Sequence, residues 1–203
     1  MAASDCFRGK LPPLELYRLA IPDTSLLQTQ VEMPSAPRFE GSIAIAPYEA
    51  PGVYGNRNLV FRIGDTQYGT YPSREWALPV PVMLGMLSEE ILHRTPLSTG
   101  GAIYAPPSYR SHDLVWRGVV RELEEVDRGR QVFASVRLEV RLVRATDDSL
   151  LWTGSARRER SVPHPTMNEI VSTLSSLSAE VIQSLADQAH AALTRSAASA
   201  ARR

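Results

Sequence analysis

A strict alternation of residue types between positions 132 and 143 constrains the fold of this chain more than any other feature. The even positions, from Val132 to Leu142, are all apolar, whereas the odd positions are mostly polar or charged. Successive side chains of a β-strand point to opposite faces of its sheet, so this period predicts a long strand with one buried face. Such a strand is stable only beside other strands, and the flanking segments are the first candidates.

The segments on either side predict an antiparallel meander. Residues 113–126 carry apolar side chains in both alternate sets, which places this strand inside the sheet with cover on both faces. Residues 127–129 (Asp-Arg-Gly) provide the turn into the alternating strand. Residues 147–148 (Asp-Asp) provide the next turn, and residues 150–160 form the third strand.

Four shorter strands are expected in the first part of the chain. Proline and glycine divide this region into apolar runs and polar segments, and the segments 24–39 and 48–58 are predicted as loops. The last two runs enclose a turn at residues 64–65 (Gly-Asp). The predicted strands cover residues 14–21, 42–47, 59–63 and 66–71.

Two segments have the helical period. Between 73 and 94, apolar residues recur three and four positions apart, and the prolines place the start of the regular helix near Pro79. Residues 166–192 carry a longer apolar stripe, which Thr166 and Glu169 open as a capping box. These elements predict an α/β fold: a single compact domain with a mixed β-sheet of about six strands, an antiparallel C-terminal meander and two main helices.

Length and composition exclude several classes of protein. The chain has 203 residues, 22 basic against 22 acidic residues, and one cysteine, which excludes a disulfide framework and a multi-thiolate zinc site. A nucleic-acid binder normally has a basic excess. The longest apolar run, 78–87, is shorter than the roughly 20 residues of a membrane-spanning helix. We expect a flexible leader over 1–13, the domain over 14–194 and a disordered Ala/Arg tail over 195–203.

The residues that could carry chemistry do not fall at catalytic spacings. The histidines are scattered, and no nucleophile or phosphate-binding motif is present, so no catalytic, cofactor or metal site is expected. Glu122, Glu124 and Glu125 are expected to be solvated strand residues that face arginines across the sheet. Four arginines form either an anionic-lipid patch or, as the glutamates among them favour, a mixed-charge sheet face: Arg137, Arg141, Arg157 and Arg160.

An ordered set of short motifs gives the sequence a family resemblance. Residues 17–19 (Tyr-Arg-Leu) open the domain, and residues 43–47 (Ile-Ala-Ile-Ala-Pro) follow. Further along come Tyr54, residues 59–62 (Leu-Val-Phe-Arg), Tyr68 and residues 76–79 (Trp-Ala-Leu-Pro). Over residues 14–194 this order resembles the ABC-type transport auxiliary lipoprotein family, which includes paraquat-inducible protein C.

The resemblance implies a non-enzymatic lipoprotein that faces the periplasm from the inner leaflet of the Gram-negative outer membrane. Such a protein works with an inner-membrane ABC transporter and an MCE-type lipid-transfer protein, and members can assemble into rings, so a homo-oligomer is expected. The family's lipidated cysteine corresponds to Cys6, and Phe7 after it favours sorting to the outer membrane. The partner ATPase would supply the energy for transport.

Three aromatic residues are candidates for partner contacts. Tyr54 lies in the predicted loop 48–58, and loops on a rigid scaffold often carry binding residues, so Tyr54 is expected to be exposed and this loop to dock onto the partner. Tyr68 belongs to the same family pattern. Trp76, expected just before the first helix, is either a core residue or a partner contact.

Two other functions stay open. Residues 1–5 contain neither the basic nor the apolar part of a secretory signal, and residues 3–5 (Ala-Ser-Asp) depart from the pattern that precedes a lipidated cysteine. The first alternative is a lipoprotein that assists assembly of an outer-membrane barrel or lipopolysaccharide exporter. The second is a cytoplasmic ligand-binding or hydrolase domain, which an upstream in-frame signal sequence would exclude.

Overall fold

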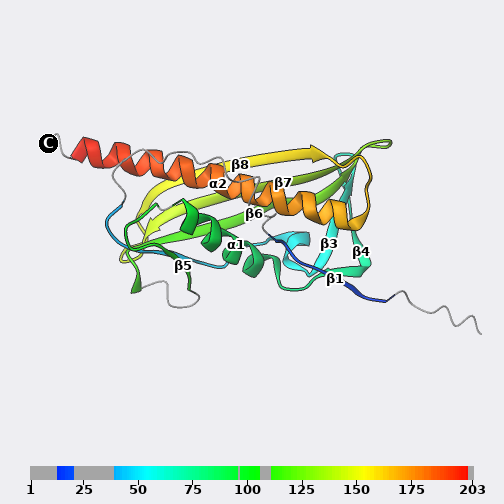
Figure 1. Ribbon diagram of the computed structural model, residues 1–203, viewed down its shortest axis with the longest axis horizontal. Helices are drawn as coiled ribbons and strands as arrows, with labels where there is room; N and C mark the ends of the chain where they lie inside the picture. Colours follow the sequence, from blue (N-terminus) through cyan, green and yellow to red (C-terminus); the bar gives the residue numbers. More distant parts are fainter. Residues whose placement is uncertain (1–12, 21–38, 96, 106–110, 201–203) are drawn as a thin grey trace, which may run out of the picture.

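In the part of the chain that the structure describes, the fold is one eight-stranded mixed sheet covered on one face by two helices (Figure 1). The structure is a computed structural model, and it describes residues 13–20, 39–95, 97–105 and 111–200, with side chains through residue 195. The predicted α/β class, with two helices packed on a mixed sheet, is therefore confirmed.

The predicted meander forms the longest strands of the sheet. β6 (Leu114–Asp127) pairs antiparallel with β7 (Val132–Arg144), which pairs antiparallel with β8 (Leu150–Ser161). The apolar even positions of β7 from Ala134 to Leu142 have no exposed surface, as the alternation predicts.

β6 organises the rest of the sheet because its second side is shared by two strands. Its first half pairs in parallel with β2 (Ile43–Ile45), and its second half pairs in parallel with β3 (Asn58–Ile63). The short strand β5 (Ala102–Tyr104) then adds to β2, and β4 (Gln67–Trp76) adds to β3. β1 (Glu15–Tyr17) pairs in parallel with β4 and ends this side of the sheet.

Both helices lie against the same face of the sheet (Figure 1). α2 (Met167–Ala200) packs along β7 and β8, and α1 (Val80–Arg94) packs against β5, β2 and α2. Thr166 Oγ1 accepts a hydrogen bond from the Glu169 amide at 3.3 Å, whereas the Thr166 amide bonds to the His164 carbonyl, so half of the predicted capping box forms. α2 continues to Ala200, so residues 195–200 are helical where the sequence predicted a tail.

Several short elements differ from the sequence prediction. β5 was not predicted, β1 has three residues rather than the expected run from 14 to 21, and the loop 48–58 contains a 3-10 helix, η1 (Gly52–Gly55). β4 continues to Trp76 instead of ending near Tyr71. Its pairing with β3 shifts register between Val60 and Asn58, and Pro72, which has no amide proton to donate, lies at this irregularity.

A polar contact inside the core joins α1 to the sheet. Tyr48 and Trp116 are buried, and Trp116 Nε1 donates a hydrogen bond to the Tyr48 hydroxyl at 3.1 Å. The same hydroxyl lies 2.8 Å from Ser88 Oγ on α1. Among the described residues, no helix is long and apolar enough to cross a membrane.

Candidate functional site

Tyr54 is buried, which corrects the expectation that it is an exposed contact. The residue is 8% exposed, and its hydroxyl donates a hydrogen bond to the Glu124 carboxylate on β6. Burial and the neighbouring Glu124 both raise the pKa of Tyr54 above its usual range, so the hydroxyl keeps its proton. Tyr54 therefore holds η1 against the sheet, and an exposed face of the loop 48–58 would have to use other residues.

Glu124 is the centre of a buried polar cluster rather than a solvated strand residue. It has no exposed surface, and its Oε1 accepts a hydrogen bond from Arg62 Nε on β3 at 2.6 Å. This bond to Glu124 raises the pKa of Arg62, whose second nitrogen donates to the Gly64 carbonyl at 2.7 Å. A buried carboxylate is stable only when it is paired in this way.

The neighbouring glutamates also have partners. Glu122 accepts a hydrogen bond from Arg157 Nε on β8 at 2.8 Å, so this carboxylate faces an arginine across the sheet as predicted. Glu125 points to the other face, where the Tyr71 hydroxyl donates to it at 2.6 Å. Burial raises the pKa of Glu125.

The other two candidate aromatic residues differ in exposure. Trp76, the last residue of β4 and four residues before α1, is 1% exposed, so of its two expected roles it has that of a core residue rather than a partner contact. Tyr68 is 48% exposed on β4, where a partner could reach it. Its role as a partner contact stays a prediction.

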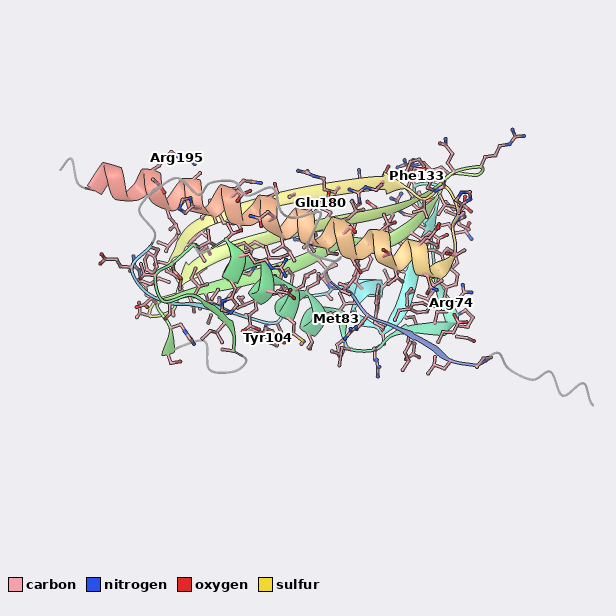
Figure 2. The ribbon with its side chains drawn as sticks, in the orientation of Figure 1. Arg74, Met83, Tyr104, Phe133, Glu180 and Arg195 are labelled. Atoms are coloured by element: carbon pink, nitrogen blue, oxygen red, sulfur yellow. The ribbon has the colours of Figure 1, made fainter. Side chains whose placement is uncertain are left out.

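Three of the four meander arginines singled out from the sequence form ion pairs, and these three are divided between both faces of the sheet. Arg157 bonds to Glu122 and also lies 3.1 Å from Glu159, and Arg137 lies 3.8 Å from Glu139. Arg160 instead reaches the helix-covered side and pairs with Glu180 of α2, which Figure 2 labels, at 2.7 Å. This arrangement fits the mixed-charge face that the sequence favoured.

A serine, a histidine and an aspartate meet before β2 and β6. His112 Nδ1 and Asp113 Oδ2 each lie 3.2 Å from Ser42 Oγ, and Asp113 also accepts the Ser42 amide at 2.8 Å. The bonds from Ser42 lower the pKa of Asp113, so its carboxylate accepts the single hydroxyl proton of Ser42, while His112 Nδ1 lies within hydrogen-bond distance of the same hydroxyl oxygen. In a hydrolase triad the histidine would accept the serine proton and the aspartate would orient the histidine. Here the three residues fix the start of two strands.

Metal ligands are not gathered in the part of the chain that the structure describes. No group of three histidine, cysteine or carboxylate side chains comes close enough to hold an ion there. Cys6, the predicted lipidation residue, lies outside the described residues.

An open groove of about 660 Å³ lies between the chain that follows β1 and one side of α1. Its apolar lining contains Leu19, Leu78, Met83, Met86 and Leu87, and Figure 2 labels Met83 on α1. The remaining lining residues are Ala20 and a set of charged or polar side chains: Arg18, Glu89, Glu90 and His93.

Exposed apolar side chains gather at this groove and at the neighbouring edge strand. Leu78 and Met86 line the groove, while Leu14 and Leu16 lie at and just before β1, and all four are exposed. The Ala77 amide donates to the Tyr17 carbonyl at 2.6 Å, which holds β1 beside the start of α1. Because monomer surfaces rarely concentrate such side chains, this region is the candidate binding surface, although no single motif in the sequence marks it.

Comparison with known proteins shows the fold. No family model and no curated protein matches the chain. Protein XCC0632 from Xanthomonas campestris, of the family DUF330, has a similar structure with a TM-score of 0.69 over 90% of this chain and 99% of that one, at 14% sequence identity. An uncharacterized protein matches with a TM-score of 0.65 over 87% of this chain and 99% of its own, at 15% identity. Hypothetical protein CT253 from Chlamydia trachomatis matches with a TM-score of 0.50 over 74% of this chain and 96% of its own, at 9% identity.

Proposed function

We propose that this chain is a non-enzymatic accessory subunit of an ABC/MCE-type lipid-transport system in the bacterial envelope. Lipidated at Cys6, it would be anchored in the inner leaflet of the outer membrane, facing the periplasm, and would dock onto the MCE-type protein. The proposal joins the family resemblance over residues 14–194 to a fold that XCC0632 shares along nearly its whole length.

The observation that carries the proposal is the position of β1. Among the described residues this strand is the last on its side of the sheet, and the residues that directly follow it line the exposed groove. A tether that joins the domain at an edge strand leaves the core undisturbed. The same geometry puts the groove and Leu14 and Leu16 close to the point of attachment, so the docking surface that we propose is β1 with the groove, rather than the loop 48–58.

The tether is tested by comparing wild type with Cys6→Ser, both expressed from the native locus. We expect wild type to sediment with outer membranes and to incorporate labelled palmitate, and the variant to lose both properties while keeping its melting temperature. A wild-type protein that remains in the cytosol without label would contradict the proposal.

A further inference from the structure

We propose that the groove beside α1 binds a short segment of a partner protein in which an acidic residue, several apolar residues and a basic residue follow one another. The inference deepens the proposed function, because it names the chemistry of the segment through which the partner would be held. It is argued from the side chains that line the groove.

The floor of the groove supplies the apolar contact. Met83 and Leu87 are largely buried below it, whereas Leu78 and Met86 are 43% and 49% exposed. Methionine side chains are flexible and polarizable, so such a surface adapts to the side chains of a bound segment. Covering the two exposed residues would remove apolar surface from water.

Arg18 supplies a positive charge at one end. Since the Tyr17 carbonyl accepts the Ala77 amide, Arg18 lies beside Leu78, where α1 begins. Arg18 is exposed, and it makes no ion pair with any residue that the structure describes. Its guanidinium can bind a carboxylate through two parallel hydrogen bonds.

Glu89 and Glu90 supply negative charge at the other end. With a helical rise of about 1.5 Å per residue, Glu90 lies roughly 15 Å along the helix axis from Val80, the first residue of α1. Glu90 pairs with Arg94 at 2.6 Å, and Glu89 accepts the Tyr104 amide at 3.2 Å, each through one carboxylate oxygen. The second oxygen of each carboxylate can accept from a basic side chain of the partner. His93 lies in the same turns of α1 and lines this end as a further polar contact.

This charge arrangement favours a peptide over an anionic membrane surface. A negatively charged lipid layer would be attracted at Arg18 but repelled at Glu89 and Glu90. A segment with opposite charges at its two ends satisfies both ends, and complementarity of this kind sets the direction in which a partner binds.

The test uses a fluorescein-labelled synthetic helix-forming peptide with Asp at one end, Leu and Ala in the middle and Lys at the other end. Its matched control has Asn and Gln in place of the charged residues. By fluorescence anisotropy at low salt, we expect the charged peptide to bind about threefold to tenfold more tightly. Arg18→Glu should remove this advantage, and a peptide with Lys in place of Asp should restore binding to that variant.

A second pair of variants tests the apolar floor. Met86→Gln should weaken binding of the charged peptide several-fold, whereas Leu150→Gln, which changes a similarly exposed apolar residue on β8, should leave it unchanged. Melting temperatures identify any variant that fails to fold. Equal binding of the two peptides, equal effects of the two variants, or binding of the protein to phosphatidylglycerol vesicles instead of the peptide would overturn the inference. So would sedimentation that shows Met86→Gln to dissociate a dimer of this chain.

Failure of this inference is distinguishable from failure of the proposed function. If Arg18→Glu and Met86→Gln still capture the envelope transporter as wild type does, the groove is not the docking site, whereas the accessory role stands. If wild type binds the charged peptide but captures no MCE protein or ABC permease, the groove inference stands and the proposed partner is wrong.

Discussion

At the scale of single residues, the most consequential feature is a carboxylate with no exposed surface. Glu124 is held by Arg62 and Tyr54, which come from β3 and η1, so one side chain of β6 fixes two other elements. Removing one member of such a cluster leaves a buried polar group without its partner, which costs more than the loss of an exposed ion pair.

Arg62→Met should lower the free energy of unfolding by about 3–5 kcal/mol, because the buried Glu124 side chain would lose its cationic partner. Urea denaturation measures this loss. The control, Arg94→Met, breaks the exposed pair with Glu90 and should cost less than about 0.5 kcal/mol. Arg62→Met combined with Glu124→Leu should recover much of the stability. Equal losses in the two single variants would contradict the account.

Tyr54→Phe should lower the free energy of unfolding by about 1–3 kcal/mol, since one carboxylate oxygen of Glu124 would lose its donor. Tyr68→Phe, which changes an exposed tyrosine, should have little effect. Thermal melts of both proteins make the comparison. A melting temperature unchanged by Tyr54→Phe would show that Tyr54 is the exposed residue that its loop position suggested.

Glu125 should make stability depend on pH in a defined direction. Burial raises its pKa in the folded state above the usual value for a glutamate, so the folded protein holds this proton to higher pH than the unfolded chain does. The contribution of protonated Glu125 to the free energy of unfolding is complete below the pKa that Glu125 has in the unfolded chain. It is lost as the pH rises through the higher pKa of Glu125 in the folded protein. Glu125→Gln should therefore gain stability relative to wild type as pH rises from about 4 upward, by urea denaturation at each pH. A difference that stays constant with pH would refute this.

At the scale of the elements, close packing at two glycines distinguishes rigid from adaptable contacts. A Cβ on Gly118 would lie 2.1 Å from the Tyr48 ring, which is buried and fixed by its hydrogen bonds to Trp116 and Ser88. A Cβ on Gly85 of α1 would lie 2.3 Å from the ring of Tyr104, which is only partly buried on the short strand β5.

Gly118→Ala should therefore cost about 1–3 kcal/mol, because the Tyr48 ring cannot move away. Gly85→Ala should cost less, since the Tyr104 ring can swing outward and alanine favours the helix by about 1 kcal/mol. Differential scanning calorimetry of the two variants ranks them. The reverse order would mean that Tyr48 is not fixed as its contacts indicate.

The sequence predicts the elements whose signal is local and misses those that depend on distant partners. The alternation over 132–143 and the helical stripe that begins at Val80 locate β7 and α1 closely. β5 has three residues and exists because β2 pairs with it, so no period within it could reveal it. In the same way, the local sequence predicts Glu124 to be a solvated strand residue. Its partners Tyr54 and Arg62 lie 70 and 62 positions away in the chain, so no local pattern shows that it is buried and paired.

At the scale of the whole molecule, the two faces of the sheet have different environments. α1 and α2 cover one face (Figure 1), while on the other face ion pairs such as Arg121–Glu139 and Arg117–Asp148 cross between strands or reach a turn. Exposed apolar residues instead concentrate near β1 and the groove. A partner that buries apolar surface would therefore approach from this edge, where the proposed tether also joins the domain.

Capture of partners from the cell envelope tests the proposed function most directly. The protein would carry a C-terminal tag at its native locus, and cross-linked envelopes would be purified through the tag and analysed by quantitative mass spectrometry. The account predicts enrichment of an MCE-domain protein together with its ABC permease. Enrichment of an outer-membrane barrel alone would favour a role in barrel or exporter assembly. Recovery from the cytosol without any envelope partner would contradict an accessory role in lipid transport.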